Sequence, residues 1–322
     1  MKKIYIGIDL GGTNIAVGIV TEDCRLLDKA SVPTGRERGF TEIMKDAVDL
    51  IHALLQRNSM DASQICAIGM GAPGVTDPDK RIIFKEVNFP AFKDENLEAE
   101  LGKYFPGVPV YLENDVNAAA YGEALCGAIQ GVSDAVVVTL GTGVGGGIIL
   151  NGKIYSGFNH AASELGHMVL NVSGPTCACG RRGCFESYAS ATALIRQTKE
   201  KLEAYPDSII HEMIGHNPDN INGKTAFDAA KQGDVAGTRI ISDYIAYLSV
   251  GITNIINLLQ PEAVVIGGGI CKEGEYLLSR VRAHVERDAY GAEGVPATRI
   301  LTAKLGNDAG IIGAAMLWKQ QS

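Results

Sequence analysis

The sequence predicts an α/β fold with two lobes, and three observations support this prediction. Apolar runs typical of buried strands alternate with stretches of helical periodicity along the chain. The length of 322 residues corresponds to roughly two domains of 150 residues each. One strand–glycine turn–strand pattern occurs twice, as DLGGTNIAVGIV from Asp9 and as TLGTGVGGGIIL from Thr139. This duplication predicts two similar lobes that close over one nucleotide.

The composition excludes several classes of partner. The formal net charge is −8, which gives no electrostatic reason to bind nucleic acid or an anionic membrane. The longest apolar run, from Ala135 to Leu150, is shorter than the ~20 residues of a membrane span and is rich in glycine. The N-terminal apolar run is broken by Asp9 and has no secretory pattern. We therefore expect a cytoplasmic protein whose cysteines are reduced thiols or metal ligands.

The first glycine-rich turn is a candidate phosphate site. Ile4 to Asp9 reads as a buried strand, and a second β run, Ile15 to Val20, follows so directly that a hairpin is expected. Backbone N–H groups of a glycine turn can hold phosphate, Asp9 could hold a hydrated Mg²⁺, and Thr13 could donate its hydroxyl. A plain tight hairpin, with glycine for positive φ, explains the turn alone equally well.

Two further glycine-rich turns follow later strands. Ala135 to Leu140 leads into the glycine turn of the second copy of the repeat, which begins at Gly141. Ala263 to Ile266 leads into Gly267–Gly269. Three glycines in a row allow close approach of a flat ring or a ribose, and an ordinary strand-to-helix turn is the alternative.

Asn114 and Asp115 are expected at a ligand-binding edge. The strand Val108 to Leu112 ends just before them, and ligands of open α/β sheets bind outside the carboxyl ends of strands. A helix is expected from Val116 to Gly127. Asp115 could therefore be catalytic or could be the N-cap of that helix, and its position fits both roles.

A zinc site is predicted between residues 160 and 186. Three cysteines lie within eight residues, and a histidine lies ten residues upstream of the first. Four N/S ligands close a tetrahedral zinc shell, so the metal would be structural. It would hold Glu164 and Glu186 towards one cavity. Reduced cysteines beside a surface histidine are the alternative. The four candidate ligands are His167, Cys177, Cys179 and Cys184.

The rest of the chain completes the two lobes. Helices are expected at 41–57, 189–204, 234–260 and 308–319, with further strands at 65–69 and 300–303. Residues 205–224 are polar and are expected to form a loop. We expect residues 1–115 to form a small lobe and residues 116–305 to form a large lobe. The last helix, within 306–322, is expected to pack back on the small lobe.

With these segments in view, the chain resembles the ROK family of sugar kinases and repressors, and within it the bacterial ATP-dependent glucokinases. The resemblance covers essentially the whole chain. Its most specific part is the order and spacing of ENDVNAAA, ELGH and CACGRRGC, and it also includes GMGAPG, VVIGGGI and LGNDAG. It implies an actin-like (ribonuclease H-like) fold of two lobes with ATP in the cleft.

The resemblance also implies roles for individual residues. Asp115 would be the general base for the primary hydroxyl of a hexose. The sugar contacts would be Gly74, Asn114, Asp115, Glu164, His167 and Glu186. The ATP contacts, with Mg²⁺, would be Asp9, Gly11, Gly12, Thr13, Asn14, Gly141, Thr142, Gly143, Gly267, Gly268 and Gly269. His167 would serve twice, as zinc ligand and sugar contact, because the second nitrogen of a metal-bound histidine usually has a partner.

The expected reaction is phosphorylation of glucose, and the same residues would also suit N-acetylmannosamine, fructose, allose or N-acetylglucosamine. A homodimer or homotetramer is implied. Sugar-responsive repressors of the family carry an N-terminal helix-turn-helix domain, for which the start at Asp9 leaves no room. Two residues depart from the family pattern: Asn14 stands where many members have Lys, and Ser163 replaces a Gly. A cation is therefore missing from the first turn.

Overall fold

The computed structural model describes residues 3–84, 89–291 and 293–321, which form two compact units. The first unit comprises residues 1–134, 147–163 and 304–322, and the second comprises 135–146 and 164–303. Met1 and Ser322, the first and last residues of the lobes that the sequence predicts, lie outside the described residues. The lobe boundary expected after Asp115 falls inside the first unit, because the helix that begins there packs on the strands of that unit.

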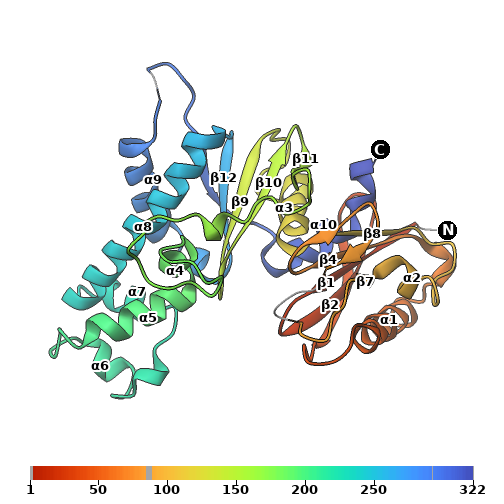
Figure 1. Ribbon diagram of the computed structural model, residues 1–322, viewed down its shortest axis with the longest axis horizontal. Helices are drawn as coiled ribbons and strands as arrows, with labels where there is room; N and C mark the ends of the chain where they lie inside the picture. The colour runs from red at the N-terminus through yellow and green to blue at the C-terminus, as the bar shows by residue number, and fades with distance from the viewer. Residues whose placement is uncertain (1–2, 85–88, 292, 322) are drawn as a thin grey trace. The chain divides into compact units, whose positions relative to one another are not determined.

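A five-stranded mixed sheet forms the centre of the first unit (Figure 1). Its order is β3-β2-β1-β4-β8, with β1 antiparallel to β2 and parallel to β4. The hairpin of β1 and β2 is the one that the sequence predicts. The strands are β1 (Ile4–Leu10), β2 (Asn14–Val20), β3 (Leu26–Pro33), β4 (Ile65–Ala72) and β8 (Val110–Asn114).

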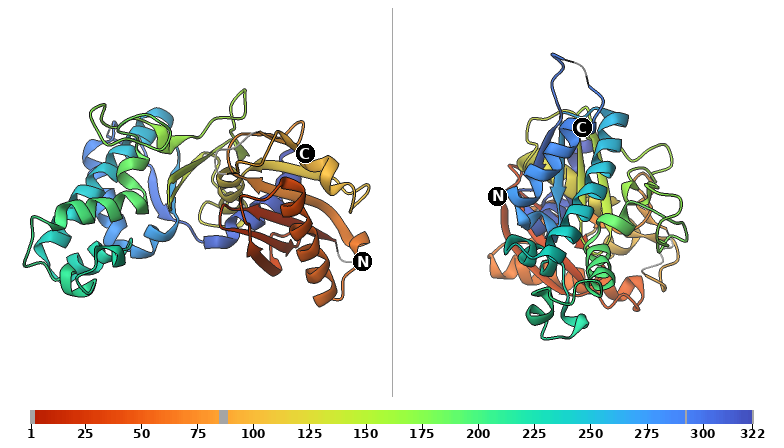
Figure 2. Two further views of the ribbon diagram at one scale, coloured as in Figure 1. Left: turned by 60° about the horizontal axis from the view of Figure 1, so that its bottom comes forward. Right: turned by 90° about the vertical axis from the view of Figure 1, so that its left-hand side faces the viewer.

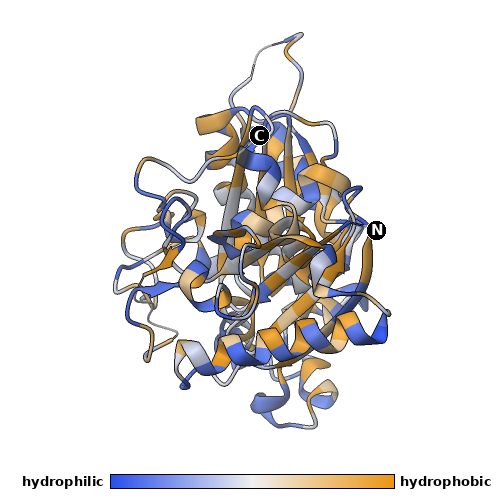
Figure 3. Ribbon diagram, turned by 90° about the vertical axis from the view of Figure 1, so that its right-hand side faces the viewer, coloured by the Kyte–Doolittle hydropathy of each residue, from blue (hydrophilic) through white to orange (hydrophobic). Residues whose placement is uncertain are grey.

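Helix α1 (Phe40–Arg57) contacts β2 and β3 through its apolar side. Ile43, Ala47, Ile51 and Leu54 recur at helical spacing, and all four are buried. Figure 3 shows the resulting alternation of hydrophobic and hydrophilic residues along this helix.

The C-terminal helix α10 (Ala309–Ala315) contacts β1, β4 and α3 (Asp115–Cys126). Glycines in the strands allow this contact, because a Cβ at Gly7 would lie 1.9 Å from the Ile311 carbonyl oxygen. A Cβ at Gly69 would lie 1.8 Å from that of Ala314. The helix backbone therefore rests directly on the strand backbone.

A second five-stranded sheet repeats the plan of the first. Its order is β11-β10-β9-β12-β13, in which β12 is parallel to β9 and β13. In each sheet, three strands that are consecutive in the chain lie side by side. The two later strands lie on the other side of the first of these three and are parallel to it. This duplicated order confirms the two-part α/β, actin-like fold. The strands are β9 (Ala135–Leu140), β10 (Val144–Leu150), β11 (Lys153–Ile154), β12 (Ala263–Gly267) and β13 (Arg299–Thr302).

Helices of the second unit pack around α8 (Val235–Leu259), as Figures 1 and 2 show. Asp234 caps its first turn through the backbone N–H of Gly237, and Gln260 ends it in a left-handed conformation at φ 44°. This is the buried central helix that the sequence predicts. The other helices are α4 (Glu186–Ala189), α5 (Ala191–Leu202), α6 (Ile210–Met213), α7 (Thr225–Lys231) and α9 (Glu275–Asp288).

The remaining elements are short. A three-stranded sheet joins β5 (Thr76–Asp77), β6 (Ile82–Ile83) and β7 (Glu95–Asn96), and α2 (Leu97–Leu101) follows it. None of the helices in the described ranges has the length and apolar character needed to cross a membrane.

Candidate active site

The first glycine turn borders an open pocket of about 530 Å³ in the first unit. Gly11 closes the hairpin by donating its backbone N–H to the Asn14 carbonyl at 3.0 Å. The buried Thr34 hydroxyl donates to the Gly11 carbonyl at 2.7 Å and supports the turn from behind. An added Cβ at Gly12 would meet nothing within 4 Å. Gly12 therefore leaves room for a ligand to approach the backbone of the turn closely, as a phosphate site requires.

Asp9, at the end of β1, shares this part of the unit with a second carboxylate. Burial, and then the negative charge of Asp115, raise the pKa of Asp9 to about 7. A Cβ at Gly310 would lie 2.6 Å from an Asp9 oxygen, so the start of α10 also closes in on this carboxylate. A buried carboxylate with a second carboxylate nearby fits a divalent cation such as Mg²⁺.

Asn114, and not Asp115, is the N-cap of α3. Its side-chain oxygen accepts the backbone N–H groups of Val116 at 2.9 Å and Asn117 at 3.2 Å. The N-cap interpretation of Asp115 is thus wrong: the chain leaves the extended conformation at Asn114, so Asp115 is the first helical residue. Asn114 also donates from Nδ2 to the Gly74 carbonyl at 3.1 Å. Gly74 has φ +77° and thus needs glycine.

Glu113 supports this turn from inside the unit, a role that the sequence did not reveal. Its carboxylate accepts the Asn114 backbone N–H at 2.8 Å and the Asn117 amide at 3.0 Å. The side chain is buried, and burial raises the pKa of Glu113. It thus fixes the residues on either side of Asp115.

The second glycine turn, in the second unit, is bound to Glu186. Gly141 donates its N–H to the Gly143 carbonyl at 3.0 Å, and the Val144 N–H donates to Glu186 Oε2 at 3.0 Å. A Cβ at Gly143 would lie 2.3 Å from the same oxygen. Thr142, between the two glycines, is exposed. The sequence predicted Gly141 to Gly143 and Glu186 as site residues, but it did not predict the contact between them.

The third glycine run forms the turn between β12 and α9. Gly268 has φ +83°, and a Cβ there would lie 2.3 Å from the Leu140 carbonyl oxygen. Packing and backbone conformation therefore explain the glycine at position 268, as expected for an ordinary strand-to-helix turn. Gly269 is different, since an added Cβ would meet nothing within 4 Å. Gly267 is buried at the end of its strand.

The four predicted metal ligands converge in the second unit. Their ligand atoms all lie within 4.8 Å of one another. The separations are 3.7 Å from Cys177 Sγ to His167 Nδ1 and 3.7 Å from Cys179 Sγ to Cys184 Sγ. Ligands of a tetrahedral zinc, with Zn–S near 2.3 Å and Zn–N near 2.0 Å, stand about 3.4–3.8 Å apart. The residues present therefore fit zinc.

Two of the cysteines have pKa values shifted in opposite directions. Burial raises the pKa of the Cys184 thiol to about 12, so this thiol needs a metal in order to ionise near neutral pH. The backbone N–H of Arg181 lowers the pKa of Cys179. Gly183 shapes the loop, because a Cβ there would lie 1.6 Å from the Asn171 carbonyl oxygen.

His167 has its two ring nitrogens directed to different partners. Nδ1 faces Cys177, and Nε2 lies 4.0 Å from Glu164 Oε2. The Glu164 side chain is 57% exposed. The ring thus offers one nitrogen to a metal and the other to a polar group beside Glu164, as the expected double use of His167 requires.

The predicted site residues fall into two sets. The first unit holds Asp9 to Asn14, Gly74, Asn114 and Asp115. The second holds Gly141 to Gly143, Glu164, His167, the cysteines, Glu186 and Gly267 to Gly269. Within each set, residues that are distant in sequence are brought together.

Comparisons with known proteins find relatives over nearly the whole chain. A model of the ROK family matches residues 5–321. A glucokinase from Thermotoga maritima is 37% identical over 320 residues, which cover 99% of this chain and 98% of the relative. The crystal structure of a ROK family glucokinase from Streptomyces griseus in complex with glucose and AMPPNP has 36% identity and a TM-score of 0.80, over 98% of each chain. A xylose repressor from Bacillus spizizenii is 32% identical over 97% of this chain and 76% of the repressor.

Proposed function

The chain belongs to the ROK family, and we propose that, as an ATP-dependent hexose kinase of that family, it phosphorylates glucose on the 6-hydroxyl. The observation that carries the proposal is the Asn114–Asp115 turn at the carboxyl end of β8. Burial raises the pKa of Asp9, at the end of β1 in the same sheet, and the charge of the half-buried Asp115 carboxylate adds to this effect. A base and a phosphate-binding turn thus belong to one unit.

In the proposed reaction, Asp115 accepts the proton of the sugar 6-hydroxyl. The hydroxyl oxygen forms a bond to the γ-phosphorus of ATP, the bond from that phosphorus to the bridging oxygen breaks, and ADP leaves with the electron pair. Phosphoryl transfer depends mainly on positioning and on charge neutralisation. Backbone N–H groups of the two glycine turns would donate to the phosphates, apart from those of Gly11 and Gly141, which close the turns themselves. Mg²⁺, held near Asp9, would neutralise phosphate charge.

Sugar recognition is proposed for Asn114, Glu164, His167 and Glu186, with the loop at Gly74 behind Asn114. Hydroxyl-specific contacts discriminate strongly, because a sugar that lacks the hydroxyl leaves a buried polar group unpaired. Nε2 of His167 and the exposed carboxylate of Glu164 form the polar pair available for this role in the second unit. Gly267 to Gly269 are proposed for the adenosine.

Zinc is proposed as a structural ion at His167 and the three cysteines. Four protein ligands fill its shell, so it takes no part in the chemistry. Its role is to hold the loop that carries Glu164 and His167.

The test is Mg-ATP-dependent phosphorylation across glucose, fructose, allose, N-acetylmannosamine and N-acetylglucosamine, reported as kcat/KM. We expect the glucose value to exceed the others by at least about tenfold. A higher value for another sugar would overturn the choice of glucose and leave the kinase mechanism in place.

The second candidate is a sugar-responsive regulator, which the identity to a xylose repressor supports. A regulator would bind sugar without turnover. The same assay separates the two, because sugar binding without phosphate transfer to any member of the panel would favour regulation.

A further inference from the structure

We propose that Lys29, on strand β3, is the cation that binds the phosphates of the nucleotide at the first glycine turn. The proposal rests on the proposed function, in which this turn holds the phosphates. The turn itself has no cationic residue, since it reads Gly11-Gly12-Thr13-Asn14.

The pocket at the turn needs a positive charge. Two carboxylates line it, Asp9 and Asp308, so a phosphate chain there needs a cationic partner in addition to the Mg²⁺ proposed at Asp9. Among the described residues that line the pocket, Lys29 is the one with a cationic side chain. An ammonium group placed there offsets the carboxylates and can donate up to three hydrogen bonds to phosphate oxygens.

The register of the strands explains why Lys29 lies at this pocket. Lys29 is paired with Gly18, and Ser31 is paired with Ala16. Residues two apart on a strand share a face, and Ser31 and Ala16 line the same pocket as Lys29. Alanine and glycine opposite this stretch of β3 leave its long side chain unobstructed by the neighbouring strand.

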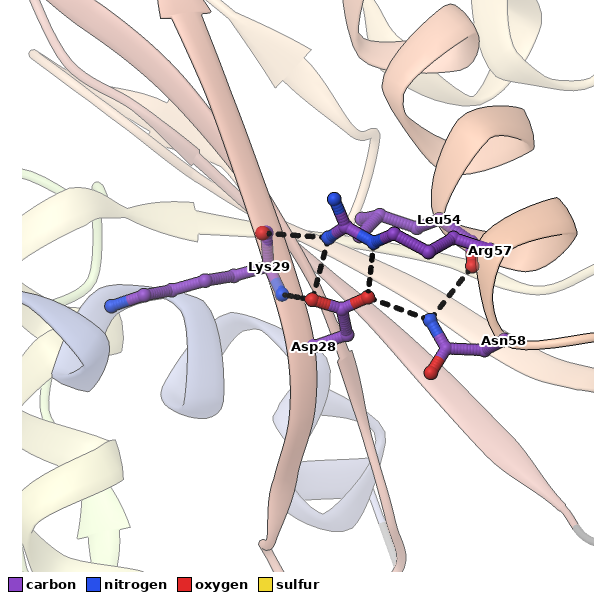
Figure 4. A network of polar contacts seen from close by, with 5 residues as sticks. All are labelled: Asp28, Lys29, Leu54, Arg57 and Asn58. Carbon is purple, nitrogen blue, oxygen red and sulfur yellow. Dashed lines mark hydrogen bonds and ion pairs between the residues drawn. The ribbon is translucent and has the colours of Figure 1, made fainter.

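The backbone at Lys29 is anchored from the other side (Figure 4). Arg57 Nη2 donates to the Lys29 carbonyl at 3.1 Å and to Asp28 Oδ1 at 2.5 Å. The Lys29 N–H donates to Asp28 Oδ1 at 2.9 Å. Figure 4 shows the Lys29 side chain extending away from this network. A fixed backbone under a long, half-exposed side chain suits a residue that must reach a ligand.

Asp308, just before α10, forms an ion pair with the Lys29 ammonium group. The two side chains are 51% and 32% exposed, and exposed ion pairs are weak and exchangeable. A phosphate chain with several negative charges can therefore displace the carboxylate. The competing explanation is a purely structural ion pair between β3 and the C-terminal segment.

The test is calorimetric binding of ATP, inorganic tripolyphosphate and adenosine to the full chain and to Lys29→Ala. We expect the variant to lose about tenfold or more in affinity for ATP and tripolyphosphate, and to bind adenosine and glucose as the wild type does. Lys45→Ala is the matched control, because Lys45 is exposed on α1 and does not line the pocket. Lys29→Arg should keep most of the ATP affinity.

A second variant supplies the charge from another position. Asn14 lines the same pocket, so Asn14→Lys combined with Lys29→Ala should regain ATP affinity relative to Lys29→Ala alone. A purely structural role of Lys29 would not be restored by this change, because the lysine at position 14 would not be held by β3.

The outcomes separate this proposal from the proposed function. ATP binding unchanged in Lys29→Ala, with sugar phosphorylation by the wild type, overturns the role of Lys29 alone. Equal losses for ATP and adenosine indicate a structural ion pair and also overturn it. If the wild type phosphorylates no sugar but its ATP affinity depends on Lys29, the kinase assignment fails and the phosphate site stands. A wild type that binds neither ATP nor tripolyphosphate overturns both.

Discussion

The Val144 backbone N–H donates a 3.0 Å hydrogen bond to Glu186, which joins the second glycine turn to the loop that carries the cysteine cluster. The other carboxylate oxygen of Glu186 lies 3.6 Å from the sulfur of Cys177. A single side chain thus contacts the turn proposed to bind phosphate and a cysteine proposed to bind zinc. The turn and the loop of the second unit should respond together to changes at Glu186.

Two substitutions of Glu186 should separate its hydrogen bond with Val144 from its proposed contact with the sugar. Glu186→Gln retains an acceptor for Val144 but loses the charge, so we expect a raised sugar KM with little change in the KM for ATP. Glu186→Ala leaves the Val144 N–H without that acceptor, which should raise both KM values and lower the free energy of unfolding by about 1–3 kcal/mol. Steady-state kinetics and denaturation check this. Equal effects of both variants on both substrates would contradict it, and Glu203→Ala, at an exposed position, is the control.

Asp115→Asn should abolish turnover while sugar still binds. An amide cannot accept the hydroxyl proton, and the loss of a general base typically costs about 10²–10⁴-fold in rate. Single-turnover kinetics and calorimetric glucose binding are the measurements. The exposed Asp49→Asn on α1 should behave as wild type. An unchanged kcat would exclude Asp115 as the base.

Cys179→Ser should release zinc and raise the sugar KM. Loss of one thiolate opens the closed shell, and the loop that carries Glu164 and His167 loses its anchor. Metal analysis should find one zinc per wild-type chain and substantially less in the variant. Cys66→Ser, outside the cluster, should keep zinc. Wild-type protein purified without stoichiometric zinc would show that the four ligands hold no such ion.

Asp9→Asn should change how stability depends on pH. The pKa of Asp9 is raised to about 7, whereas a carboxyl group in an unfolded chain titrates near 4. The folded chain therefore binds the Asp9 proton more tightly than the unfolded chain does. The stabilisation that this proton gives is complete below about pH 4 and is lost as the pH rises through about 7.

The amide that this substitution introduces at position 9 cannot ionise, so the variant should escape this loss. Without nucleotide or Mg²⁺, the Tm of the variant relative to wild type should therefore rise between about pH 5 and pH 8. Thermal denaturation across that range is the measurement, with Asp49→Asn as control. A difference that stays constant with pH would show that Asp9 has no raised pKa.

Gly69→Ala should destabilise the first unit. Its Cβ would lie 1.8 Å from the Ala314 carbonyl oxygen, so α10 must move away from the sheet. Overpacking of this kind costs about 1–3 kcal/mol or more. Denaturant unfolding would measure the change. Gly291→Ala, where an added Cβ meets nothing within 4 Å, should be close to neutral, and equal stability of both variants would contradict the packing argument.

Much of the fold was predictable because it depends on local pattern. The glycine hairpins, the helix at 40–57 and the central helix at 235–259 follow from hydrophobic periodicity and turn residues. The metal cluster followed from ligand types that have few other uses at such spacing. Comparison with known proteins confirmed the family resemblance.

Other features depend on long-range contacts that no local pattern contains. Strand β3 is half exposed, so its weak alternation did not stand out, and with it Lys29 was missed. Helix α9 was missed as well, because its many charged residues obscure a narrow buried face. The capping role of Asn114 needed the backbone conformation, and the contact of Glu186 with Val144 joins residues 42 positions apart.

The position of α10 has a consequence for how the chain is made. The strands of the first unit leave the ribosome early, but their glycine-lined face is covered by a helix from residues 309–315. All residues of the second unit are synthesised between these two parts. Domains generally fold as units during synthesis, so the nascent chain must hold the first sheet with that face uncovered until the C-terminal segment emerges. The part of the protein that is translated first is the last to be completed.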